Sequence, residues 1–112
     1  SYYRRRKQYD DMQSTIDKAL AAPRKKSNDY FDAATLLYRA GRNLDGAANL
    51  VRTYLTTAKP NEEAPIFEAH YLLGQIFEKQ GNKAAAADEY RTSLSLASNY
   101  GPAQEALKRV AG

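Results

Sequence analysis

The stretch that decides the fold is residues 70–94, HYLLGQIFEKQGNKAAAADEYRTSL. Two runs rich in strong helix formers lie on either side of Gly81-Asn82, a dipeptide typical of turns. In the first run Leu73, Ile76 and Phe77 recur at intervals typical of one helix face. The stretch therefore predicts two helices joined by a tight turn.

The same pattern occurs a second time, earlier in the chain. Residues 47–55, AANLVRTYL, match residues 86–94, AADEYRTSL, at a shift of 39 positions. The preceding runs, 30–41 and 70–81, match at a shift of 40, which predicts one extra residue in the turn of the first pair. A repeat of this length indicates a solenoid of helical hairpins.

Turn signals divide the rest of the chain into segments of helical length, and no segment has the pattern of a strand. The expected helices are residues 8–22, 28–40, 44–58, 62–80, 83–98 and 102–110. A short piece before them, Tyr3 to Lys7, is interpreted as the tail of a separate first helix. Gly101 to Val110 is interpreted as half of a following unit or as a capping helix.

Residues 67–100 resemble a tetratricopeptide repeat. The positions that carry this resemblance are His70, Leu73-Gly74, Phe77, Gly81, Ala86 and Tyr90, with Ser98 where the family has proline. The resemblance implies an all-α, right-handed α-solenoid of antiparallel hairpins. It implies a single domain, 1–112, composed of a partial repeat (1–26), two repeats (27–66 and 67–100) and a partial repeat or capping helix (101–112).

The composition excludes most catalytic chemistry. The 112 residues include no cysteine and one histidine, which removes thiol nucleophiles, cysteine-zinc sites and paired imidazoles. The adjacent acids Asp10-Asp11, Glu62-Glu63 and Asp88-Glu89 diverge by about 100° on a helix and do not face one substrate atom. We expect His70 to be a packed histidine with one hydrogen-bond partner. The sequence therefore predicts a non-enzymatic protein without a metal or a cofactor.

The charge pattern does not favour nucleic acid as the partner. The net charge of +4 comes with two basic runs, Arg4 to Lys7 and Arg24 to Lys26, each near an expected helix end. The later basic residues alternate with acidic ones instead of forming a stripe. No apolar run approaches the ~20 residues that span a bilayer, so no membrane span is expected.

The resemblance places function on the first helix of each hairpin, which lines a concave groove for peptides or partner helices in that family. The groove positions carried over are Asn28, Phe31, Asp32, Thr35, Tyr38, Arg39, Glu68, Tyr71, Gln75, Glu78 and Lys79, with Arg4, Arg5, Glu105 and Arg109 from the partial units. Their mixture of aromatic and charged side chains suits a protein or peptide with an apolar or aromatic anchor and acidic groups.

Two functions remain open from the sequence. The first is a non-catalytic protein-interaction module that binds a peptide or a helix in the groove. The alternative is a structural or assembly element that stacks on further repeats or self-associates through exposed repeat ends, in which case the groove is incidental.

Overall fold

The computed structural model describes residues 2–20, 27–57 and 66–111. These ranges form six α-helices and contain no strand, which confirms the all-α prediction. The helices are α1 (Tyr2–Leu20), α2 (Ser27–Ala40), α3 (Leu44–Thr57), α4 (Ile66–Lys79), α5 (Lys83–Leu96) and α6 (Gly101–Ala111). None of them has the length and apolarity needed to cross a lipid bilayer.

The predicted helix bounds agree with the structure to within two residues for α2, α3, α5 and α6. For α4 the C-terminal end agrees within one residue, whereas the expected start at residue 62 and the cap at Asn61 lie outside the described residues. The basic run Arg24 to Lys26 also lies outside them, as do the expected ends of the first and third helices at residues 22 and 58.

The prediction of a separate helix before residue 8 was wrong. Helix α1 is continuous from Tyr2 to Leu20. No glycine or proline occurs within this range to interrupt the hydrogen-bond ladder, so local propensity continues the helix where the repeat pattern suggested a break.

The two matching pairs turn by the same chemistry. Gly41 and Gly81 have φ of 67° and 86°, a backbone conformation that glycine adopts without a steric cost. Their N–H groups donate to the carbonyls of Tyr38 and Glu78, and each closes the end of its helix at 3.0 Å. Each turn thus has a glycine at a positive-φ position, and these two glycines are 40 positions apart.

The second helix of each pair is capped by an asparagine, Asn43 before α3 and Asn82 before α5. These two asparagines are 39 positions apart. The side chain of Asn82 accepts a hydrogen bond from the Ala85 N–H at 3.2 Å, and Asn43 accepts one from the Gly46 N–H at 3.3 Å. The predicted extra residue is therefore Arg42, between Gly41 and Asn43. Asn43 itself has φ of 48°, so the longer turn requires a left-handed residue at the cap.

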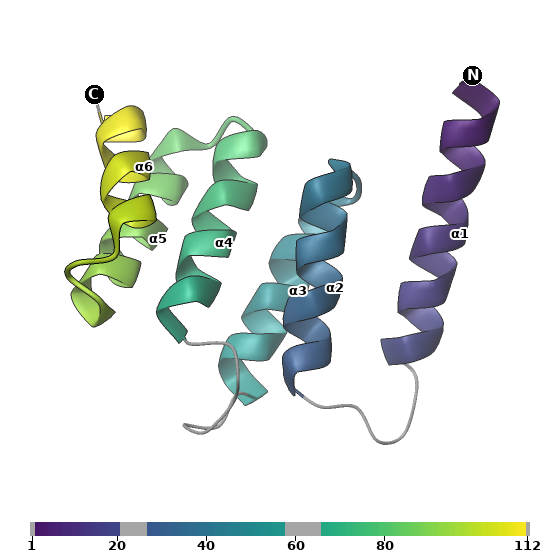
Figure 1. The fold of residues 1–112 in the computed structure, drawn as a ribbon, viewed down its shortest axis with the longest axis horizontal. Helices are drawn as coiled ribbons and strands as arrows, with labels where there is room; N and C mark the ends of the chain where they lie inside the picture. The colour runs from purple at the N-terminus through teal and green to yellow at the C-terminus, as the bar shows by residue number, and fades with distance from the viewer. Residues whose placement is uncertain (1, 21–26, 58–65, 112) are drawn as a thin grey trace.

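The helices pack in chain order, as Figure 1 shows: each contacts the next, and α2 also contacts α4. In that view α2, α4 and α6 lie in front, with α3 and α5 behind them. The extents of 39 × 36 × 18 Å agree with a slab two helices deep, because packed helices lie about 8–10 Å apart.

Small residues allow close packing within each pair. Gly74 on α4 faces Tyr90 on α5, and a Cβ at Gly74 would lie 2.6 Å from Cε1 of that ring. The corresponding positions in the first pair hold Ala34 and Val51, which are both fully buried in the core. Ala34 is larger than Gly74, and Val51 is smaller than Tyr90. The summed volume of the two residues is therefore roughly the same in both pairs.

Helix α1 is attached to the turn between α2 and α3. The Arg42 guanidinium carbon lies 4.2 Å from the centroid of the Tyr9 ring, and the Asn43 side-chain amide donates to Gln13 Oε1 at 3.0 Å. Ile16 is buried in the same core as α2, α3 and α4. These contacts place α1 beside α2, at one end of the slab (Figure 1).

Candidate functional site

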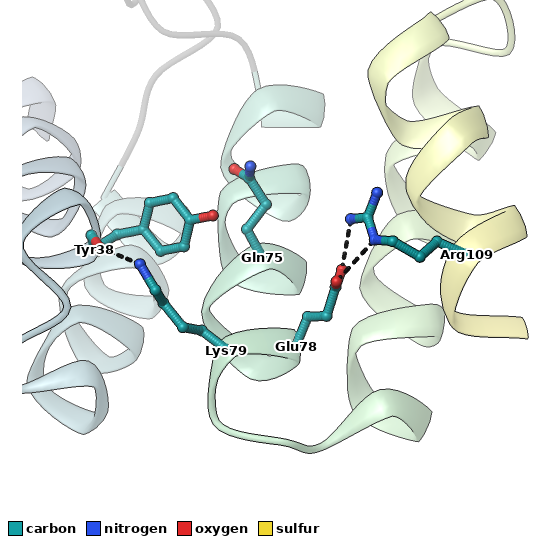
Figure 2. Close-up of a pocket in the computed structure, with 5 residues that line it drawn as sticks. All are labelled: Tyr38, Gln75, Glu78, Lys79 and Arg109. Carbon is teal, nitrogen blue, oxygen red and sulfur yellow. Dashed lines mark hydrogen bonds and ion pairs between the residues drawn. The ribbon is translucent and has the colours of Figure 1, made fainter.

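The first candidate site is a hollow of about 230 Å³ between α2, α4 and α6. It is lined by Tyr38 from α2, Gln75, Glu78 and Lys79 from α4, and Arg109 from α6, and we refer to it as the three-helix hollow (Figure 2). Gln75, Glu78 and Lys79 share one face of α4 because helix residues three and four apart are neighbours.

Glu78 holds together the α6 side of the hollow. Arg109 binds its carboxylate in bidentate fashion, with Nε to Oε2 and Nη2 to Oε1, both at 2.8 Å. The hydroxyl of the buried Tyr90 on α5 donates to the same Oε1 at 2.8 Å. These bonds link α4, α5 and α6, so the charge of Glu78 is already compensated inside the protein.

The electrostatics fix the protonation states of this cluster. The Arg109 guanidinium, followed by the Tyr90 hydroxyl, holds the pKa of Glu78 below its usual value despite partial burial. The bond to Glu78 raises the pKa of Arg109, and burial together with Glu78 raises that of Tyr90. At neutral pH Glu78 is therefore a carboxylate, Arg109 is a cation and Tyr90 is a neutral donor.

Lys79 and Tyr38 form the opposite wall. The Lys79 ammonium donates to the Tyr38 backbone carbonyl at 3.1 Å and lies 4.6 Å from the centroid of its ring. Burial, then the nearby Tyr71 and Glu78, raise the pKa of Tyr38, so its hydroxyl is protonated at neutral pH. Figure 2 shows this hydroxyl pointing across the hollow toward Gln75.

The hollow is consequently rich in hydrogen-bond donors. Its described lining residues include two cations, Lys79 and Arg109, and one carboxylate, Glu78. The Tyr38 hydroxyl and the Gln75 amide add neutral donors. This chemistry suits an incoming acceptor, and an anionic one above all.

A second, larger hollow of about 420 Å³ lies over α2, which supplies the described residues that line it. The residues around it are Phe31, Asp32, Thr35, Leu36 and Arg39, and we call this surface the α2 face. The Phe31 and Tyr54 rings pack edge to face with their centroids 5.5 Å apart, and the Thr35 hydroxyl donates to the Phe31 carbonyl at 2.9 Å. Leu36 leaves 48% of its surface exposed.

The structure divides the groove residues expected from the sequence between these two surfaces. Tyr38, Gln75, Glu78 and Lys79 meet at the three-helix hollow, together with Arg109, whereas Phe31, Asp32, Thr35 and Arg39 lie on the α2 face. The side chains of Asn28, Arg4 and Arg5 are outside those that the structure describes. Glu105 is exposed on α6 and pairs with Lys108 at 3.8 Å.

The remaining two expected residues, Glu68 and Tyr71, lie beside an aromatic cluster. The Tyr71 ring lies 5.7 Å from Tyr90 and 5.4 Å from Tyr100, which in turn meets Phe67 at 4.9 Å. Tyr71 is only partly accessible for this reason. Burial raises the pKa of Tyr100, and the charge of Glu68 adds to the effect.

The sequence did not predict two of these residues, Tyr100 in the aromatic cluster and Leu36 on the α2 face. The turn signals predict Tyr100 only as part of a turn, although an aromatic residue directly before a helix is a candidate for packing back on its neighbours. Leu36 was not predicted, although Asp32 and Arg39, four residues before it and three after it, share its helix face.

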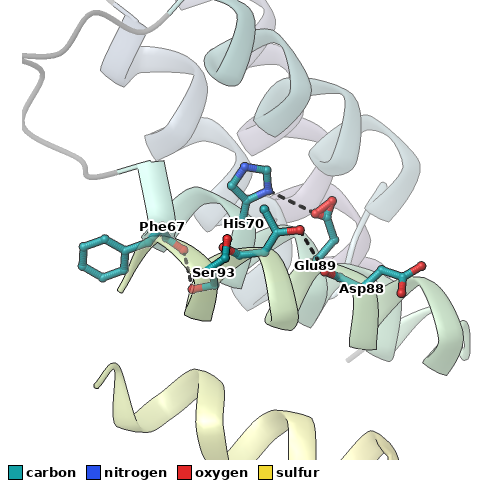
Figure 3. A network of polar contacts seen from close by, with 7 residues as sticks. Phe67, His70, Asp88, Glu89 and Ser93 are labelled. Carbon is teal, nitrogen blue, oxygen red and sulfur yellow. Dashed lines mark hydrogen bonds and ion pairs between the residues drawn. The ribbon is translucent and has the colours of Figure 1, made fainter. Parts of the chain in front are cut away.

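A separate network of polar contacts joins α4 and α5 outside the three-helix hollow (Figure 3). His70 Nδ1 lies 3.2 Å from Glu89 Oε2, and each side chain is 20% exposed. The buried Ser93 hydroxyl donates to the Phe67 carbonyl at 2.8 Å. His70 is thus a packed histidine with one partner, as expected, and no group of three potential metal ligands occurs among the described residues.

Comparison of the chain with protein-family models, with curated proteins and with solved structures finds no match in any of the three. The resemblance to tetratricopeptide repeats therefore stays a prediction from the residues quoted above.

Proposed function

We propose that this protein is a non-catalytic interaction module of the tetratricopeptide-like, right-handed solenoid class. Its groove runs across α2, α4 and α6 and takes a peptide or a partner helix. The observation that carries the proposal is the three-helix hollow, because alternate helices of the chain supply its lining side chains. A ligand lying there would contact three successive helical units at once.

The register of the helices supports this arrangement. Gln75 on α4 and Arg109 on α6 both line the three-helix hollow, and they are 34 residues apart. At the same shift Ala69 corresponds to Ala103, and both are fully buried. Equivalent positions of α4 and α6 thus have equivalent surroundings: one helix face packs in the core, and another lines the groove.

The chemistry of the hollow favours an acidic ligand group next to an apolar or aromatic one. Glu78 is compensated by Arg109 and Tyr90, which leaves Lys79, the outer nitrogen of Arg109 and the Tyr38 hydroxyl to face a ligand. Tyr38 offers a ring face as well as a donor. No reaction and no cofactor form part of the proposal.

The test is selection of peptides from a random display library on the intact protein. A groove variant, Tyr38→Ala/Gln75→Ala/Lys79→Ala, changes the wall of the hollow but keeps the bonds of Glu78. A matched control, Asp88→Ala/Arg91→Ala, removes an exposed ion pair on α5. Circular dichroism verifies the helix content of both.

We expect one acidic motif that binds the intact protein and the α5 control but not the groove variant. Motifs that bind all three proteins equally, or no enrichment at all, would reject the groove as the ligand site.

A further inference from the structure

The α2 face is uncovered where the equivalent face of α4 is covered. Shifted by 40 residues, Leu36 corresponds to Ile76 and Asp32 to Leu72. Ile76 is fully buried and Leu72 is 5% exposed, both in a core cluster that also includes residues of α2 and α3, whereas Leu36 is 48% exposed and Asp32 is exposed. A hollow of about 420 Å³ remains over this face of α2.

Opposite charges stand at the two ends of the α2 face. Asp32 and Arg39 are both exposed, and neither forms an ion pair with a side chain that the structure describes. They are seven positions apart, about 10.5 Å along the helix. Thr35 and Leu36 occupy the midpoint between the two charges.

This pattern is complementary to itself under a two-fold rotation. When two α2 helices lie antiparallel with the rotation axis near Thr35 and Leu36, Asp32 of each copy stands opposite Arg39 of the other. The exposed Leu36 side chains then meet near the axis and fill part of the hollow. The same patch on both copies makes an isologous contact that closes at two chains.

We propose that the α2 face is a homodimer interface, in which α2 packs antiparallel to α2 of a second copy. This goes beyond the peptide groove, because the residues of the α2 face are distinct from those of the three-helix hollow. A protein could therefore dimerise through one surface and bind a ligand through the other.

The surface of α6 argues against open-ended stacking as the alternative. At the 34-residue shift, the position of Gly74 on α4 is occupied on α6 by Lys108. Gly74 allows α5 to approach α4 closely, whereas the Lys108 side chain is 77% exposed. A helix of another copy would have to displace the Lys108 side chain to approach α6 as closely as α5 approaches α4, which disfavours head-to-tail growth.

The expected dimer is weak. One helix face from each copy lies at the small end of the range of specific interfaces, so we expect dissociation in the micromolar range or above. Sedimentation equilibrium from about 10 to about 500 µM covers this range. The mass should rise from one chain toward two and should not exceed two.

Charge exchange provides the decisive variants. Asp32→Arg places two cations on each α2 face, and Arg39→Asp places two anions on each, so each variant alone should remain monomeric. Mixed in equal amounts, the two should form a heterodimer, because each basic face then meets an acidic one. Both positions are exposed on the helix surface, and circular dichroism checks that each variant keeps its helices.

The matched control is Asp88→Arg, an exposed acid on α5 that should leave dimerisation unchanged. A mass of one chain at every concentration would overturn the proposal. So would masses above two chains, or a dimer that both single variants retain. Peptide selection on the monomeric Asp32→Arg variant separates this proposal from the groove, since a groove ligand should still bind it.

Discussion

The contact between Gly74 and Tyr90 gives the sharpest prediction about packing. A Cβ added at Gly74 would lie 2.6 Å from Cε1 and 2.8 Å from Cδ1 of the Tyr90 ring. That ring cannot move aside easily, because it is fully buried and its hydroxyl is bonded to Glu78 at 2.8 Å. Gly74→Ala should therefore overpack the interface between α4 and α5.

The magnitude follows from two opposing effects. Alanine in place of glycine within a helix gains about 1 kcal/mol, whereas overpacking of a core costs about 1–3 kcal/mol. Gly74→Ala should thus destabilise the protein by up to about 2 kcal/mol. In a Tyr90→Val background the ring is gone, as in the first pair where Ala34 corresponds to Gly74 and Val51 to Tyr90. The same substitution should then stabilise by about 1 kcal/mol.

The assay is urea denaturation of all four proteins, followed by circular dichroism, and the quantity of interest is the coupling free energy of the double-mutant cycle. The reasoning predicts coupling of about 1–3 kcal/mol and a change of sign between the two backgrounds. Equal effects of Gly74→Ala with and without the Tyr90 ring would refute it.

Three further perturbations test bonds seen in the structure. Because Arg109 lowers the pKa of Glu78, the pair contributes stability above the ordinary glutamate pKa of about 4.3 and loses it as pH falls through the lower folded value. The Glu78→Gln variant should thus be less stable than the unchanged protein by about 1–2 kcal/mol at pH 7. Urea titrations at several pH values should show that this difference in the free energy of unfolding shrinks in acid. A difference that does not depend on pH would contradict this. Ser93→Ala removes a buried hydroxyl bond and should cost about 1–2 kcal/mol in the same assay, while Ser95→Ala, at an exposed position, should cost less than half as much. Asn82→Ala removes the cap of α5 and should lower the free energy of unfolding by about 1 kcal/mol; an unchanged urea midpoint would show that water replaces the cap.

The helices were predictable because several local signals coincide at each boundary. Gly41 and Gly81 adopt the positive φ that turn chemistry predicts, and Asn82 caps the helix that follows it. The continuous α1 was not predicted, because the repeat pattern was extended to a segment whose residues contain no helix-breaking signal. Local propensity decided the outcome there.

The site was only partly predictable, because helical position determines which face a residue occupies but not what lies opposite. Tyr38, Gln75 and Lys79 were expected together and do meet. Tyr71 was expected beside them, but Tyr100, 29 residues later, packs against its ring. The contact depends on how the turn before α6 returns to α4, which no local pattern specifies.

Equivalent positions of the alternate helices show how one register produces different surfaces. At a single register position stand Ala34, Gly74 and Lys108, on α2, α4 and α6 in turn. The first two are small because another helix packs closely against each, and the third is exposed. Two residues further along α2, Leu36 is exposed although its equivalent Ile76 is buried. Side-chain size at the shared register position thus marks where another helix covers the surface. Leu36 is a large apolar residue that no described helix covers, and for this reason a second helix is expected on the α2 face.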